Sequence, residues 1–165
     1  MNTRSPLDNP KCWPLAEAVR RRDLLRSDGR TLAVTNGCFD LMHAGHLYFL
    51  ASAARHGDAL WVLLNGDASV RDLKGPDHPI QTAEERAYAL AALTVVDGVV
   101  IFPSLRLADE ILAVKPDVYL KAGDYSMETI DPTEKKALHE IGARIEFLPL
   151  LEGYSTSTLI ERIRG

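Results

Sequence analysis

The sequence predicts an α/β protein with a single doubly wound, parallel, five-stranded sheet. Two observations carry this prediction. Apolar runs such as "TLAVT" and "ALWVLLN" are continuous rather than alternating, which is typical of strands buried on both faces. The same runs alternate along the chain with segments of helical periodicity, as parallel strands joined by crossover helices require.

The expected elements follow one another in order. Five short apolar runs are expected to be strands: residues 31–35, 59–65, 95–102, 117–123 and 143–150. Six segments are expected to be helices: residues 14–29, 45–57, 82–93, 105–115, 132–142 and 155–165. Gly57 fits a left-handed helix end, Gly142 ends its helix, and Pro116 ends the helix before it. Thr82 and Glu85 fit a capping box at the start of their helix.

Residues 66–81, "GDASVRDLKGPDHPIQ", separate the second strand from the capping box. Glycine, aspartate and proline are frequent in this segment, which favours a loop. Residues 66–79 of this loop contain few side chains that could be buried and include Lys74, so we expect them to form a lid that substrate orders.

Length and composition indicate one packed domain over residues 1–165, with residues 1–30 as an N-terminal helical extension. At 165 residues and 46% hydrophobic content, the chain is long enough for a single core. No apolar run reaches the roughly 18 residues of a membrane helix, and the N-terminus lacks the apolar centre of a signal peptide. We therefore expect a cytoplasmic protein without a membrane partner. The 19 Lys and Arg against 23 Asp and Glu argue against a nucleic-acid partner.

Ligands of doubly wound sheets bind outside the carboxyl ends of the strands, where the chain order reverses. This rule selects four loops: "TNGCFDLMHAGH", "NGDASVRDLKGPDHP", "KAGDYSM" and "EGYSTST". Each loop combines glycine with polar or cationic residues. We therefore expect the functional site where these four loops meet.

His43 and His46 lie three positions apart in "HAGH", next to a predicted helix. Hydrogen-bonded structural histidines are the plainest alternative. A zinc site is less favoured, because only Cys38 and Asp40 lie nearby and the H-E-x-x-H spacing is absent. Anion binding fits best, since the glycine turn, the start of the helix and the imidazoles all supply N–H donors. A triphosphate suits such a site.

Four motifs in this order, "TNGCFDLMHAGH", "LKGPDHPI", "KAGDY" and "GYSTSTLIERI", resemble those of the cytidylyltransferase-like nucleotidyltransferase superfamily. Within it, "TNGCFDL", "LKGP" and "KAGDY" are most similar to the heptose 1-phosphate adenylyltransferases, over residues 31–164. The resemblance implies a Rossmann-like nucleotidyltransferase fold. It also implies an enzyme that makes ADP-heptose and pyrophosphate from ATP and D-glycero-D-manno-heptose 1-phosphate, for surface glycans such as lipopolysaccharide. The implied cofactor is Mg²⁺, carried mainly by the triphosphate.

The resemblance assigns roles to three sets of residues. The catalytic set, which would grip the triphosphate and stabilise its developing charge, is His43, His46 and Lys74. The nucleotide-binding set is Asn36, Gly37, Cys38, Phe39, His43, His46, Lys121, Gly123, Asp124, Ser155, Thr156 and Ser157. The substrate-binding set is Asp40, Asn65, Asp67, Lys74 and Arg86. Within the last set, Asp40, Asn65 and Asp67 could meet either the sugar phosphate or Mg²⁺.

Structural alternatives stay open for two of the charged residues. Lys74 could be a solvated surface lysine. Arg86 could form a surface ion pair with Glu84 or Glu85, which would contribute little to stability.

Alternatives also stay open nearer the strand ends. Lys121 could simply end a strand, and the hydroxyl groups of residues 155–157 could cap the last helix while also binding the nucleotide. Cys38 has no base partner in its motif, and the reaction needs no covalent step, so we expect this cysteine to pack rather than attack.

Three functional hypotheses follow. The first is a heptose 1-phosphate adenylyltransferase. The second keeps the chemistry but uses CTP with glycerol 3-phosphate or another small phosphate ester, although the Gly-Thr-Phe-Asp motif and arginine-threonine pair of that group are missing. The third is a nucleotide-binding regulatory module without turnover, which the retained histidines, lysine and arginine make least favoured.

The resemblance further implies a homodimer and a separate sugar kinase acting upstream. The apolar segment around Trp13 and Leu15 is a candidate contact surface. It could cover either its own domain or a neighbouring copy.

Overall fold

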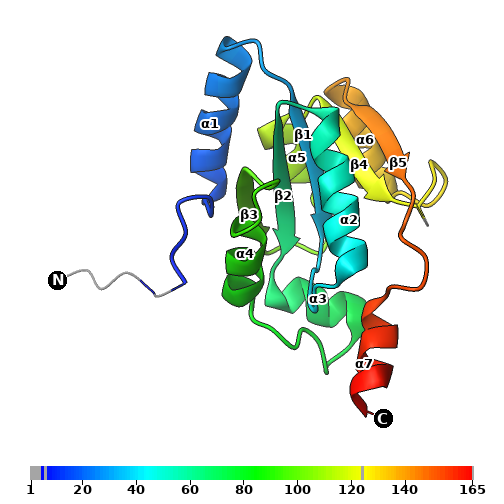
Figure 1. Ribbon diagram of the computed structural model, residues 1–165. Helices are drawn as coiled ribbons and strands as arrows, with labels where there is room; N and C mark the ends of the chain where they lie inside the picture. The colour runs from blue at the N-terminus through cyan, green and yellow to red at the C-terminus, as the bar shows by residue number, and fades with distance from the viewer. Residues whose placement is uncertain (1–4, 6, 124, 165) are drawn as a thin grey trace.

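The computed structural model describes Ser5, residues 7–123 and residues 125–164 of the chain. Its centre is one sheet with the strand order β3-β2-β1-β4-β5 (Figure 1). The strands are β1 (Leu32–Gly37), β2 (Ala59–Asn65), β3 (Gly98–Phe102), β4 (Val118–Ala122) and β5 (Arg144–Leu148). All neighbouring strands pair in parallel. The predicted doubly wound α/β fold with five parallel strands is confirmed.

Helices cover both faces of this sheet. They are α1 (Leu15–Ser27), α2 (Ala44–Ala53), α3 (Asp67–Lys74), α4 (Ala83–Ala91), α5 (Ala108–Val114), α6 (Pro132–Glu140) and α7 (Thr156–Arg164), and the 3-10 turn η1 (Ala54–His56) follows α2. Helices α2 and α4 pack on one face, whereas α1, α5 and α6 pack on the other (Figure 1). The predicted capping box of Thr82 and Glu85 is present at the start of α4.

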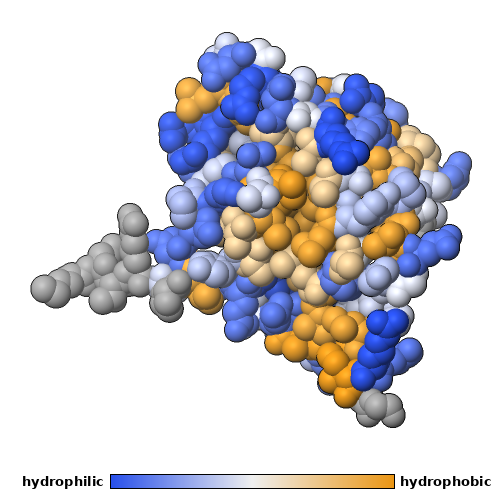
Figure 2. Space-filling model, viewed as in Figure 1, coloured by the Kyte–Doolittle hydropathy of each residue, from blue (hydrophilic) through white to orange (hydrophobic). Residues whose placement is uncertain are grey.

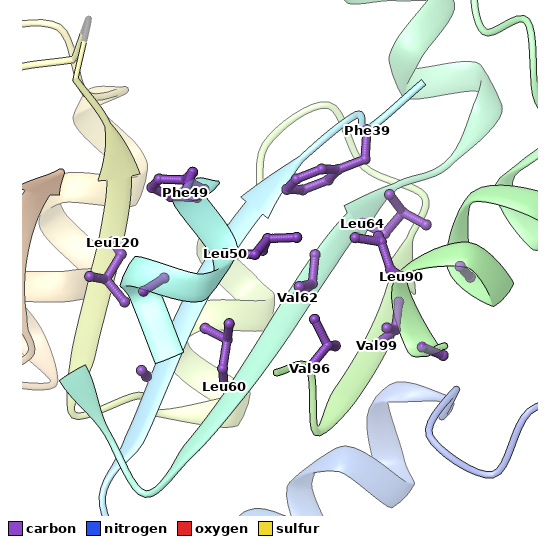
Figure 3. Packing of buried hydrophobic residues seen from close by; sticks show 14 of the residues in the cluster. Phe39, Phe49, Leu50, Leu60, Val62, Leu64, Leu90, Val96, Val99 and Leu120 are labelled. Atoms are coloured by element: carbon purple, nitrogen blue, oxygen red, sulfur yellow. The ribbon is translucent and has the colours of Figure 1, made fainter. Parts of the chain in front are cut away.

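Strand β2 shows why the apolar runs of the sequence are continuous. All of its residues are buried, and successive side chains point to opposite faces of the sheet. Leu60, Val62 and Leu64 pack in the cluster under α2 and α4 (Figure 3). Trp61 and Leu63 pack in the second cluster, under α1, α5 and α6. Because both faces need apolar side chains, the strand shows no polar alternation.

The largest difference from the sequence-based expectation lies in residues 66–81. The segment expected to be a loop begins with helix α3, so the loop assignment is wrong for residues 67–74. Gly66 is the extended N-cap residue, Asp67 places negative charge in the first turn, and Gly75 ends the helix at a φ of 98°. Val70 is fully buried and anchors the helix. The segment is therefore not an unstructured lid in this conformation.

The segment before α1 folds back on the sheet. Cys12 forms a parallel bridge with Val99 in β3, and the Trp13 ring lies edge-on to Trp61, with centroids 5.1 Å apart. A Cβ atom at Gly98 would come within 2.1 Å of the Trp13 ring, so this close approach requires glycine. Of the two options left open by the sequence, the segment around Trp13 covers its own domain.

The chain order reverses beside β1. The chain runs outward from β1 through β2 to β3, and β4 then pairs with the other side of β1. The carboxyl ends of β1 and β4 therefore form the crevice in which ligands of such sheets bind.

Helix α7 lies at the edge of the molecule, beyond the end of the sheet (Figure 1). Its Ile163 side chain is 72% exposed, and apolar residues gather on the surface over this helix (Figure 2). Across the described ranges, none of the helices combines the length and the apolar character needed to span a bilayer.

Candidate active site

A cavity of about 680 Å³ opens at the carboxyl ends of β1 and β4. Its volume is in the range typical of small-molecule sites. The predicted residues in its wall are Asn36, Gly37, Cys38, Phe39, His43, His46, Asn65, Lys74, Lys121, Ser155 and Thr156. Residues from all four loops selected by the sequence therefore meet around one cavity.

His43 and His46 form a stacked pair at the start of α2. His43 is the extended N-cap residue, and the two ring centroids are 3.9 Å apart with an angle of 30° between the rings. Gly45 permits this arrangement, since a Cβ atom there would lie 3.0 Å from the His43 ring and 3.2 Å from Tyr154 Cβ. The Phe39 ring lies 5.2 Å from that of His46. Packing therefore fixes both imidazoles beside the cavity.

Burial favours the neutral form of both imidazoles. It lowers the pKa of His43, and burial together with His43 and Lys74 lowers the pKa of His46 to about 4. The Nδ1 atoms of both rings are buried without a hydrogen-bond partner in the described part of the chain. Unpaired buried nitrogens are costly, so a purely structural role for this pair is disfavoured.

The zinc alternative finds no support in the arrangement of side chains. Among the described residues, no group of three or more His, Cys, Asp or Glu side chains is placed to hold a metal ion. The paired histidines are better suited to an anion at the start of α2.

We expect the buried His46 to make the fold less stable in acid. Its pKa of about 4 lies below the ordinary 6.5, so between these values the unfolded chain binds a proton that the folded chain does not. The contribution of His46 to the free energy of unfolding should be complete above pH 6.5. It should fall by roughly 2–3 kcal/mol as the pH decreases to about 4.5.

Urea unfolding of the wild type and of His46→Gln at both pH values measures this contribution. The variant should lose less stability in acid than the wild type does. An equal loss of stability in the two proteins would show that the pKa of His46 is not lowered in the folded state.

The turn after β1 combines a close approach with a strained residue. Phe39 has a positive φ of 46°, which is costly for a residue that carries a Cβ atom. Its buried ring lies over Gly37, where a Cβ atom would come within 2.9 Å of it. Burial raises the pKa of the neighbouring Cys38 thiol, so the nucleophilic thiolate is disfavoured. This agrees with the expected packing role of Cys38.

Lys74 and the start of α7 add favourable sites for negative charge. Lys74 is the last residue of α3, is exposed, and forms no ion pair with any described residue. Ser155 Oγ accepts a hydrogen bond from the Thr158 N–H, and Ser155 and Thr156 both lie in the cavity wall. Since helix starts attract anions, the capping role and a binding role for these residues are compatible.

A polar cluster lies between the cavity and helix α6. The Tyr119 hydroxyl and Lys121 Nζ each donate to Asn36 Oδ1 at 2.7 Å. Lys121 Nζ also lies 3.9 Å from Glu134 Oε2, and burial raises the pKa of this glutamate. Lys121 therefore does more than end β4, because its ammonium group takes part in the polar lining of the site.

Sequence reasoning misses several residues of the site: Arg106, Tyr119, Tyr125, Asp131 and Glu134. Arg106 Nε and Asp131 Oδ2 form an ion pair of 3.1 Å at the cavity. Tyr119 had a usable signal, because it lies two residues before Lys121 on one strand and must share its face. Arg106 and Asp131 come from two separate loops, so their meeting has no local signal.

Arg86 lies beside the cavity rather than in its wall. The residue is 1% exposed, and its guanidinium donates to the carbonyl oxygens of Cys38 and Gln81 and to the carboxylate of Asp67. The alternative of a surface ion pair with a neighbouring glutamate is therefore wrong. The phosphate-binding role of Arg86 stays a prediction.

Asp40, like Arg86, makes its contacts with other residues of the protein. Its buried carboxylate accepts the N–H groups of Ile80 and Gln81 and lies 2.8 Å from His78 Nδ1. Burial alone would raise the pKa of Asp40, but the Gln81 N–H and the other donors lower it overall. Asp40 thus ties the turn after β1 to the segment after α3, and its contact with substrate stays a prediction.

The remaining predicted residues are placed as follows. Asn65 ends β2 in the cavity wall, and its Nδ2 donates to Ser69 Oγ at 2.8 Å. Gly123 and Ser157 are exposed and lie outside the wall. Asp124 lies outside the described residues.

Comparisons with known proteins agree with this geometry. A family model described as cytidylyltransferase-like matches residues 34–162. A relative from Syntrophotalea carbinolica, named bifunctional protein HldE, is 45% identical over 86% of this chain, and one of the same name from Alkalilimnicola ehrlichii is 47% identical over 85%. The chain spans 29% of the length of each of these relatives.

A solved structure shows the same fold. It is described as the lipopolysaccharide core biosynthesis protein from Thermoplasma volcanium, and it matches 77% of this chain and all of its own chain with a TM-score of 0.62. At 24% sequence identity, this likeness supports the fold alone. By the family match over residues 34–162, the chain belongs to the cytidylyltransferase-like family of the nucleotidyltransferase superfamily.

Proposed function

We propose that the protein transfers AMP from ATP to D-glycero-D-manno-heptose 1-phosphate, giving ADP-heptose and pyrophosphate. The observation that carries the proposal is the stacked pair of His43 and His46 at the start of α2, in the same cavity as Lys74. Membership of the cytidylyltransferase-like family supports nucleotidyl transfer. The motifs "TNGCFDL", "LKGP" and "KAGDY" support a heptose phosphate as the acceptor.

The reaction depends on positioning and charge stabilisation. An oxygen of the sugar phosphate, ionised at neutral pH, forms a bond to the α-phosphorus of ATP while the bond from that phosphorus to pyrophosphate breaks. Negative charge therefore builds on the α-phosphate oxygens and on the leaving pyrophosphate. No residue needs to take a proton from the nucleophile.

The start of α2 is suited to the triphosphate. Backbone N–H groups and the positive end of the helix dipole favour an anion there. His43 and His46 can each donate a ring N–H while neutral, and a nearby triphosphate raises the pKa of both, so that they can gain positive charge. Lys74 supplies a fixed positive charge from a different element, and Ser155 and Thr156 supply hydroxyl groups at the start of α7.

We expect Mg²⁺ to bind mainly through the triphosphate. The ion retains several waters and is commonly held by substrate phosphates with one or two carboxylates. Asp40 and Asp67 already accept hydrogen bonds from His78 and Arg86 respectively, which limits their share in its coordination. Bound Mg²⁺ would neutralise part of the charge on the phosphates.

A substrate screen tests the proposal. With Mg²⁺ present, the kcat/KM for ATP with the heptose 1-phosphate should exceed that for CTP by about ten- to a hundredfold. The reason is that a wrong base leaves buried polar groups unpaired, at roughly 1–3 kcal/mol each. Pyrophosphate release measures the reaction, and glycerol 3-phosphate serves as the competing acceptor.

Two results would redirect the assignment. A higher kcat/KM for CTP than for ATP, with any phosphate ester, would favour a cytidylyltransferase acting on glycerol 3-phosphate or a similar small ester. Nucleotide binding without pyrophosphate release from any pair would favour a regulatory module.

The homodimer and the separate sugar kinase stay predictions. The exposed apolar surface over α7 supports a contact with another copy, in place of the segment around Trp13, which packs on its own sheet (Figure 2).

A further inference from the structure

We infer that Tyr119 is a positioning residue of the nucleotide site, which acts by fixing the side-chain amide of Asn36 toward the bound nucleoside triphosphate. The inference rests on the proposed function, because it concerns the same cavity. Tyr119 itself is fully buried and is absent from the cavity wall, so it acts only through Asn36.

Strand geometry brings Tyr119, Asn36 and Lys121 together, and we refer to these three residues as the device. Val34 in β1 and Tyr119 in β4 are paired in the sheet and belong to the same buried cluster. Asn36 and Lys121 each lie two residues further along their strands, so they share that face. The device therefore sits where β1 and β4 meet, at the reversal of chain order that forms the crevice.

Two donors determine which way the Asn36 amide turns. The Tyr119 hydroxyl and Lys121 Nζ both donate to Asn36 Oδ1 at 2.7 Å. An ammonium group has donors only, so a reversed amide would set its NH₂ against the Lys121 ammonium. Burial raises the pKa of Tyr119 well above its ordinary value, so its hydroxyl keeps the proton that it donates.

The fixed amide leaves its NH₂ group for a ligand. Asn36 Nδ2 has no hydrogen-bond partner among the described residues, and it is not one of their buried unpartnered atoms. Asn36 lies in the cavity wall, and we infer that this group faces the cavity. Two N–H donors beside a lysine ammonium suit an oxygen acceptor of the nucleotide, either a phosphate or a ribose oxygen.

Tyr119→Phe tests the device, because it removes the hydroxyl while keeping the buried ring. Titration calorimetry with ATP and Mg²⁺ should show a Kd about tenfold higher than that of the wild type, as expected for one poorly held hydrogen bond. The KM for ATP should rise in parallel, whereas kcat and the KM for the sugar phosphate should stay within about threefold. Tyr88→Phe is the matched control, because this exposed tyrosine of α4 is outside the cavity wall and should change none of these values.

Variants of Asn36 separate positioning from a general effect on the fold. Asn36→Asp keeps an acceptor for Tyr119 and Lys121 but removes the NH₂ group and adds a negative charge, so it should weaken ATP binding at least as much as Asn36→Ala. In the Asn36→Ala background, Tyr119→Phe should cause no further loss of affinity for ATP. The inference would be overturned if Tyr119→Phe lowered the affinity for ATP as much in the Asn36→Ala variant as in the wild type. Wild-type affinity in Tyr119→Phe alone would also overturn it.

The same titrations keep this inference distinct from the proposed function. A wild type that binds CTP more tightly than ATP would refute the proposed base, and the Tyr119 variants would then be judged with CTP. A wild type that binds ATP but releases no pyrophosphate would refute the proposed reaction, and the binding data would still decide the role of Tyr119. A wild type that binds neither nucleotide would overturn both.

Discussion

Replacement of His46 by alanine should lower kcat for pyrophosphate release by at least about a hundredfold, and replacement of His43 should do the same. Both rings face the cavity at the start of α2, where negative charge is expected to build in the transition state. Loss of one such donor costs about 3 kcal/mol of transition-state stabilisation. The melting temperature should change little at neutral pH, because neither ring forms a hydrogen bond with a described residue through its buried Nδ1.

Steady-state kinetics and thermal unfolding measure the two effects separately. His139→Ala is the matched control, since His139 is exposed on α6 and outside the cavity wall, so turnover should be unchanged. Glutamine at position 46 keeps an N–H donor and should recover part of the lost turnover. Near-normal turnover of His46→Ala would remove the histidine pair from the catalytic machinery.

The sheet could be predicted from the sequence because burial on both faces determines the residues of each strand locally. A strand such as β2, which is buried on both faces, needs apolar side chains on both of them, and this is visible in the run "ALWVLL" before Asn65. Helix boundaries follow similarly local rules, as the capping box of Thr82 and Glu85 shows. The reversal of chain order beside β1 then locates the crevice without any further information.

Helix α3 was not predicted from the sequence because the contacts that stabilise it are not local. It has only eight residues, most of them exposed, and the residues that it buries are Ser69 and the apolar Val70. So short a segment is weak evidence for a helix by itself, and the glycine, aspartate and proline content of residues 66–81 resembles that of a loop. The helix forms because the rest of the fold supplies the surface that Val70 packs against.

The contacts of the candidate site also divide into local ones and ones between residues far apart in the sequence. The histidines and the glycine of "HAGH" lie on one turn, so their meeting follows from sequence spacing. The contacts of Tyr119 and Asn36 join positions 83 residues apart, and those of Arg86 and Cys38 join positions 48 residues apart. A single sequence does not show which distant positions pair, which explains why residues of the cavity wall were predicted better than the residues that hold them in place.

Replacement of Arg86 by alanine should destabilise the fold by roughly 3–5 kcal/mol, because it removes the buried guanidinium from a network that joins three segments of the chain. The guanidinium is fully buried, and it joins the turn after β1, through the Cys38 carbonyl, to Gln81 before α4 and to Asp67 at the start of α3. Alanine would leave two carbonyl oxygens and one carboxylate without this donor. Urea unfolding at neutral pH measures the loss.

The comparison with two further variants distinguishes this role from phosphate binding. Arg71→Ala removes an exposed arginine of α3 and should change the free energy of unfolding by less than about 0.5 kcal/mol. Arg86→Lys keeps the charge but has no planar fork for three separate acceptors, so it should recover only part of the stability. If Arg86→Ala instead unfolds like the wild type while its KM for a phosphate substrate rises, Arg86 is a substrate ligand and the buried network contributes little. Loss of stability with substrate KM values unchanged in the folded fraction assigns Arg86 to the support of the turn that carries Cys38.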